Sequence, residues 1–243
     1  MQTGIEDVGG DPGEERARQH AERNLSTSIV AIEFTLISVM VGVVLFPLVE
    51  EATVLLHDRS YQYWPYIVTG LLMTLYLWSA VITHSLTFIG WPMDFGHNLL
   101  YITLALVLAV QMHFLADPLA WFAITPLSAA VAGLTVYYDL RVVEQRLVGG
   151  TGAAGAVFTA ALAQQRLQLR LMPAYVAVAF VPLALVLLWP EWFVERGGHI
   201  VLIAGQALAV AVALWRTVCT FDGWAPLILR RAMEELETEE ARA

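Results

Sequence analysis

Six long apolar stretches constrain this sequence more than any other feature. A helix needs about 20 apolar residues to cross the hydrocarbon core of a bilayer. The stretches that meet this requirement are residues 27–49, 65–89, 96–116, 119–139, 173–190 and 199–221. Charged residues, Pro or Gly separate each stretch from the next, and a bundle of helices satisfies the backbone polar groups in lipid. The sequence therefore predicts an all-α, polytopic integral membrane protein with six transmembrane helices.

The composition supports a membrane protein and excludes several classes of soluble protein. The chain is 58% hydrophobic and 14% charged, whereas soluble domains carry about 25% charged residues. These values argue against a disordered chain, a nucleic-acid-binding protein and an ordinary cytosolic enzyme. The single cysteine, Cys219, excludes an internal disulfide and a cysteine-based metal site.

The arginines predict how the chain is oriented in the membrane. All 13 basic residues are arginines, and with the N-terminus inside only Arg59 and Arg196 fall in outer segments. This bias follows the positive-inside rule. We therefore expect both termini in the cytoplasm, and the inner membrane of a bacterial or archaeal cell as the location.

The distribution of charge also predicts the domain organisation. Residues 1–26 and 222–243 are acidic and are expected to form cytoplasmic tails, the second of them helical. The transmembrane domain is expected to span residues 27–221. Within it, residues 140–172 are predicted to form an inner-leaflet loop and an amphipathic helix, in which Arg166 and Arg170 face lipid phosphates.

Polar residues inside apolar helices are costly and often mark transport pathways or proton relays. One face of the third helix carries His97, Tyr101, Leu108 and Gln111. We expect Gln111 and Gln206 to face protein or water, because an unpaired amide in hydrocarbon costs several kcal/mol. Hydroxyl residues on the first helix form a stripe that either packs closely or lines a pore. The intramembrane candidates for transport are Glu33, Thr35, Ser38, His84, His97, Gln111, Asp139, Gln206 and Arg216.

Glu33 and Arg216 lie at matched depth from the same membrane surface. Both are about five residues inside a predicted span, which is roughly 7–8 Å at 1.5 Å per residue. Their opposite charges predict an ion pair between the first and last helices, with His84, His97 and Asp139 nearby. The alternative is that Arg216 extends to the phosphates by itself.

The histidines support a second interpretation. A b-type haem needs two histidines on facing helices at matched depth, and His113 with His199 is one candidate pair. His84 and His97 form another only if the helix ends fold toward each other. No cofactor is predicted by the principal interpretation, and haem b belongs to this alternative.

The predicted outer loops are acidic, which is typical of a mouth that attracts cations. The candidate residues for this mouth are Glu50, Glu51, Asp117, Glu191 and Glu195. The principal functional prediction is a channel or transporter for a small cation or other small solute. The alternatives are a membrane redox or enzyme component and an accessory or structural subunit. The acidic C-terminal helix and the lack of any compact catalytic motif support the accessory or structural subunit, and an enzyme is the less favoured interpretation. The small size of the bundle favours a homo-oligomer in the lipid bilayer.

Overall fold

The computed structural model describes residues 12–87, 95–147 and 152–240, and within these ranges the chain is all-helical. The elements are α1 (Pro12–His57), η1 (Tyr61–Tyr63), α2 (Trp64–Thr87), α3 (Phe95–Met112), α4 (Pro118–Leu147), α5 (Gly152–Leu188), η2 (Glu191–Glu195) and α6 (His199–Glu240). Six helices are long and apolar enough to span a membrane. The protein is therefore an all-α integral membrane protein with six transmembrane helices, as predicted.

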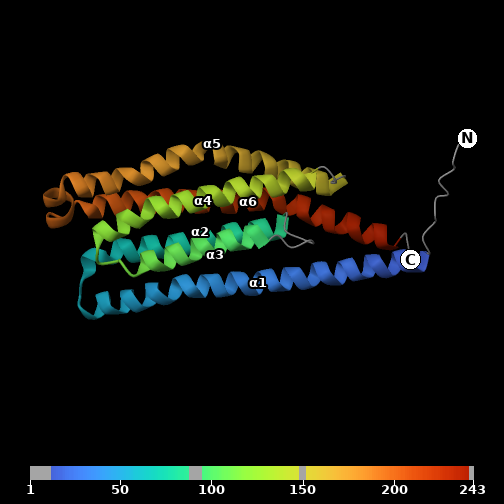
Figure 1. Cartoon of the computed structure of the whole chain (residues 1–243), viewed down its shortest axis with the longest axis horizontal. Helices are drawn as coiled ribbons and strands as arrows, with labels where there is room; N and C mark the ends of the chain where they lie inside the picture. The colour runs from blue at the N-terminus through green and yellow to red at the C-terminus, as the bar shows by residue number, and fades with distance from the viewer. Residues whose placement is uncertain (1–11, 88–94, 148–151, 241–243) are drawn as a thin grey trace, which may run out of the picture.

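The long helices lie roughly parallel to one axis, and successive ones run in opposite directions (Figure 1). We call the end of the bundle where α1 begins and α6 ends the terminal end, and the opposite end the far end. The helices α1 and α5 lie at opposite edges, with the other four between them (Figure 1). The principal contacts close a ring in the order α1, α2, α6, α5, α4, α3 and back to α1. Helix α2 also touches α3 and α5 across the ring.

The buried face of α1 shows how the sequence selects this packing. Ile37, Met40, Val44 and Leu48 are buried and recur every three or four residues, so they lie on one face of a helix. Apolar residues on other faces, such as Phe46, remain exposed. Lipid solvates those exposed apolar residues, so burying them gains little free energy. Close van der Waals packing between helices drives their association in the membrane instead.

Glycine allows two close contacts within the ring. A Cβ atom at Gly70 of α2 would lie 2.6 Å from Met112 Sδ and 3.0 Å from Leu48 Cδ1. A Cβ atom at Gly133 of α4 would lie 2.7 Å from Met172 Cγ. A larger residue at either position would require the facing methionine side chain to move.

Helix α5 differs from the sequence prediction. Residues 140–147 complete α4, and α5 continues from Gly152 through Pro173 to Leu188, so the expectation of a separate amphipathic helix ending at residue 172 is wrong. Residues 148–151 of the expected loop lie outside the described ranges. A proline removes one backbone hydrogen bond, but in lipid the remaining backbone groups must still be paired, which keeps the helix continuous. Arg166 pairs with Glu144 of α4 at 3.2 Å. Its charge is therefore held by a neighbouring helix as well as by any headgroup.

The predicted tails are largely continuations of the long helices. Residues 12–26 belong to α1 and residues 222–240 to α6, while residues 1–11 and 241–243 lie outside the described ranges. The terminal part of α6 contacts the bundle, because Arg231 Nη1 donates to the carbonyl oxygen of Thr87 at the end of α2, at 3.3 Å.

Candidate functional site

A buried polar network connects four helices inside the ring, near the terminal end. We call it the histidine–aspartate cluster and define it as His84 of α2, His97 and Tyr101 of α3, Asp139 of α4 and Gln165 of α5. Asp139 is completely buried. Its Oδ1 lies 2.6 Å from His97 Nδ1, and its Oδ2 lies 2.9 Å from His84 Nδ1. One carboxyl group therefore bridges two imidazoles.

Tyr101 and Gln165 complete the network. The Tyr101 hydroxyl lies 2.6 Å from His84 Nδ1 and donates to Asp139 Oδ2 at 3.3 Å. The Gln165 amide nitrogen lies 3.0 Å from His84 Nε2. An amide nitrogen can only donate, so this contact makes His84 Nε2 the acceptor and leaves the proton of a neutral ring on Nδ1. That nitrogen faces both the Tyr101 hydroxyl, at 2.6 Å, and Asp139 Oδ2, at 2.9 Å.

The sequence anticipated part of this network. His84, His97 and Asp139 were candidates, and the two histidine rings are 6.5 Å apart between centroids. The predicted face of α3 is also confirmed, because His97, Tyr101, Leu108 and Gln111 are all buried. Gln165 was missed because it lies in the segment predicted as an amphipathic surface helix.

Glu33 has a different partner from the one predicted. Asn98 Nδ2 donates to Glu33 Oε1 at 2.7 Å, and both side chains are buried. Arg216 is exposed on α6, and no ion pair joins it to Glu33 within the described residues. The predicted pair is wrong because α1 packs against α2 and α3, whereas α6 packs against α2 and α5. Two residues at the same depth in the membrane can lie on helices that do not touch. The partner Asn98 directly follows His97, and a polar amide within an apolar span is the signal that could have identified it.

A second polar network lies nearer the far end, and we call it the amide cluster. Its members come from α2, α3, α4 and α6 and are Tyr66, Gln111, Trp121, Thr125, Ser128, His199 and Gln206. Gln111 Nε2 donates to Thr125 Oγ1 at 3.0 Å, and Ser128 donates to Gln111 Oε1 at 3.0 Å. Trp121 Nε1 donates to Gln206 Oε1 at 3.0 Å. Both glutamines therefore face protein, as expected.

His199 belongs to this amide cluster and not to a histidine pair. Its Nδ1 lies 3.1 Å from the Tyr66 hydroxyl. His113 is about half exposed and lies 3.6 Å from Glu51. The structure thus gives the two proposed haem ligands different neighbours and does not bring them together.

The hydroxyl stripe of α1 lies outside the ring. Thr35 donates to the carbonyl oxygen of Ala31 at 2.9 Å, and Ser38 donates to that of Phe34 at 2.9 Å. Both residues are exposed. Their hydroxyls are satisfied by their own helix. The stripe therefore does not line a passage inside the ring, and a pore formed with another surface stays a prediction.

The acidic residues of the far end have separate environments. Asp117 Oδ1 accepts from the backbone N–H of Ala120 and caps α4. Glu51 faces His113, and Glu191 and Glu195 are exposed on η2.

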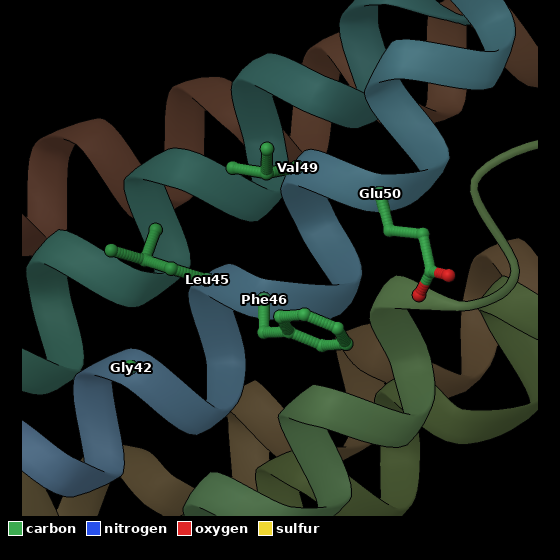
Figure 2. Close-up of a pocket in the computed structure, with 5 residues that line it drawn as sticks. All are labelled: Gly42, Leu45, Phe46, Val49 and Glu50. Atoms are coloured by element: carbon green, nitrogen blue, oxygen red, sulfur yellow. The ribbon is translucent and has the colours of Figure 1, made fainter.

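Glu50 lies in an open hollow lined by Gly42, Leu45, Phe46, Val49 and Glu50, all from α1. Figure 2 shows this hollow along one side of α1.

The two clusters differ in how completely their buried atoms are paired. Among the described residues, Glu33 Oε2, Ser85 Oγ and Gln165 Oε1 are buried without a hydrogen-bond partner. Gln165 Nε2 contacts His84 Nε2, so the unpaired Gln165 Oε1 lies at the histidine–aspartate cluster. The buried side-chain atoms of the amide cluster are all paired within the described chain. Unpaired buried polar atoms are rare in proteins and indicate a bound water, ion or proton.

No group of three or more His, Cys, Asp or Glu residues in the described ranges is arranged to hold a metal ion. Comparison of the whole chain with models of known protein families, with curated proteins and with solved structures gave no match. The function must therefore be argued from the geometry of the clusters.

Proposed function

We propose that this protein transports protons across the membrane, as a channel or transporter in which the histidine–aspartate cluster is the proton-binding site. The observation that supports it is the carboxyl group of Asp139 shared between His84 and His97 inside the ring. Proton relays in membrane pumps and transporters are commonly formed by buried Asp, Glu and His residues within the membrane helices. This proposal specifies the cation of the wider channel or transporter prediction.

The cluster has suitable chemistry for binding and releasing a proton near neutral pH. Histidine is the side chain whose charge normally changes between pH 5 and 8. When a proton binds to His84 Nε2, the ring becomes an imidazolium whose Nδ1–H faces the Tyr101 hydroxyl and Asp139 Oδ2. The carboxylate then neutralises the new charge in a buried region of low dielectric. The Gln165 amide can rotate so that its unpaired Oε1 accepts the new Nε2–H.

An apolar layer separates this proton-binding site from the far end. On α3, Ala105 and Leu108 lie between Tyr101 and Gln111, and both are buried together with Leu77 of α2. The ten residues from Tyr101 to Gln111 correspond to about 15 Å along the helix. A buried apolar constriction blocks water and ions. We therefore assign this conformation as closed toward the far end, and transport requires the layer to open.

The test is proton flux into liposomes that contain the purified protein. A potassium gradient with valinomycin supplies the driving potential, and a pH-sensitive dye inside the vesicles reports proton entry. The wild type is compared with Asp139→Asn and with His113→Gln, a histidine outside the cluster. We expect flux in the wild type and in His113→Gln, and loss of flux in Asp139→Asn.

Absence of proton flux in the wild type at either polarity of the potential would refute the proposal. Equal flux in Asp139→Asn and the wild type would show that the cluster is not the proton-binding site. A visible spectrum of the same sample checks the haem alternative, which requires a Soret band.

We also propose that both termini lie in the cytoplasm of a bacterial or archaeal cell and that the protein forms a homo-oligomer. The arginine distribution supports this orientation. A reporter fused after residue 243 tests it, because periplasmic reporter activity would contradict it. The mass of the protein in a native membrane extract tests the oligomeric state.

A further inference from the structure

Glu33 is a second buried acid that the histidine–aspartate cluster does not include. It lies in the span Ala31–His57, and its side chain is 1% exposed. It lies on the same buried stripe as Ile37 and Met40. A carboxyl group therefore lies on a packing face of α1 whose other described buried residues are apolar.

The surroundings of Glu33 are those of a neutral acid. Asn98 donates one hydrogen bond to Oε1, and Oε2 has no hydrogen-bond partner within the described chain. No ion pair to Glu33 occurs among the described residues. An ionised carboxylate with a single neutral donor is very costly in an apolar environment, whereas a protonated one is tolerated.

The titratable groups on the neighbouring helices are engaged elsewhere. Helix α1 packs against α2 and α3. His97 of α3 and His84 of α2 both direct Nδ1 at Asp139. Asp139 lies between those histidines, and Tyr101 donates to it. No basic side chain from α2 or α3 therefore pairs with Glu33.

We infer that Glu33 with Asn98 is a second proton-binding site, in which Glu33 holds a proton as a neutral carboxylic acid in the membrane. Its Oε1 is the carbonyl oxygen that accepts from Asn98, and the proton resides on Oε2. The inference does not depend on proton transport by the other cluster. The two acids are still linked structurally, because the consecutive residues His97 and Asn98 hold Asp139 and Glu33. A shift of this turn of α3 would disturb both sites together.

A buried protonated acid is a target for the hydrophobic reagent dicyclohexylcarbodiimide. The carboxyl proton moves to one nitrogen of the carbodiimide, and the carboxylate oxygen bonds to its central carbon. The resulting O-acylisourea rearranges by transfer of the acyl group to nitrogen and gives a stable N-acylurea. No other reactant is required, and the adduct is located by mass spectrometry of peptides.

The experiment labels the full chain in liposomes at neutral pH. We expect an adduct on Glu33 in the wild type and in Asp139→Asn, no adduct at position 33 in Glu33→Gln, and no adduct on the exposed, arginine-paired Glu144. Labelling that is suppressed by sodium chloride but not by choline chloride would show a bound metal cation and overturn the inference.

Infrared spectroscopy decides the case in which the reagent does not reach the site. Glu33→Gln imitates a protonated acid in shape and charge and is expected to fold. We expect it to lose one band in the carbonyl region of protonated carboxylic acids. We expect Asn98→Leu to shift that band to higher frequency, because the hydrogen bond to Oε1 is removed. No band lost in Glu33→Gln would overturn the inference whatever the labelling result. Since Asp139→Asn is studied in parallel, failure here is distinguishable from failure of proton transport.

Discussion

The two buried polar networks of this bundle differ in charge and in completeness. The histidine–aspartate cluster contains a carboxyl group and two imidazoles, and Gln165 Oε1 is unpaired in the described structure. The amide cluster also connects four helices, but through neutral amide, hydroxyl, indole and imidazole groups. Its buried side-chain atoms are paired within the described structure. Both networks lie inside the ring and connect four helices.

This difference separates a structural network from one that can change state. A fully paired neutral network fixes the relative positions of the helices, because moving any member breaks hydrogen bonds and costs free energy. A network with spare acceptors and titratable groups has more than one arrangement of nearly equal energy. We therefore assign the amide cluster to holding the far end together and the histidine–aspartate cluster to proton binding.

The largest effect on proton flux should come from replacing both histidines of the histidine–aspartate cluster. We expect His84→Gln with His97→Gln to lower proton flux about 100-fold or more, the usual contribution of a positioned proton-transfer group. The matched change in the amide cluster is Gln111→Met with Ser128→Ala, which should leave the flux of the folded protein unchanged. Flux per reconstituted molecule in liposomes is the measurement. Equal losses in both double variants would remove the functional distinction between the clusters.

The second prediction concerns stability, for which a change in the amide cluster should have the larger effect. Gln111 is fully buried and bonds Thr125 and Ser128. Gln111→Leu leaves these partners unpaired, and we expect it to lower the free energy of unfolding by about 1–3 kcal/mol. The measurement is unfolding in detergent micelles under a denaturant, with Val110→Leu, an exposed neighbour, as the control. An unchanged free energy of unfolding would show that the amide cluster does not hold the helices together.

The third prediction concerns how Gln165 sets the charge of His84. In Gln165→Glu, a carboxylate faces His84 Nε2 and can only accept, so it favours the imidazolium. We expect the midpoint of the pH profile of flux to rise by about one pH unit, the lower end of the effect of an adjacent opposite charge. Gln165→Met fills similar space without a charge and should not raise the midpoint.

Nuclear magnetic resonance of the His84 ring in the same variants measures its protonation directly. A midpoint that moves equally in Gln165→Glu and Gln165→Met would mean that Gln165 acts by packing alone.

The fold was largely predictable because lipid imposes a simple rule on length and polarity. Six spans followed from runs of apolar residues, and the buried face of α3 followed from the spacing of His97, Tyr101 and Gln111. The break expected before Pro173 was wrong, because proline is a weaker signal in a membrane helix than in a soluble one.

The site was less predictable because depth in the membrane does not fix which helices are neighbours. Glu33 and Arg216 matched in depth and in charge, yet α1 and α6 each pack against other helices. The ring order depends on close contacts such as that of Gly70 with Met112, which no single helix encodes. Asp139 and the two histidines were found because buried charge is rare in any membrane helix, whatever its neighbours.

The smallest effect is expected for the hydroxyls on the outside of α1. Thr35 and Ser38 bond only to carbonyl oxygens one turn earlier in their own helix, and their side chains are exposed. We expect Thr35→Ala with Ser38→Ala to change the free energy of unfolding by no more than about 0.5 kcal/mol, as for most surface substitutions. Proton flux should be unchanged, since these residues lie outside both clusters. The same flux and unfolding assays measure both quantities. A large loss of flux in this double variant, without loss of stability, would mean that protons pass along the outside of α1 and would contradict a pathway inside the ring.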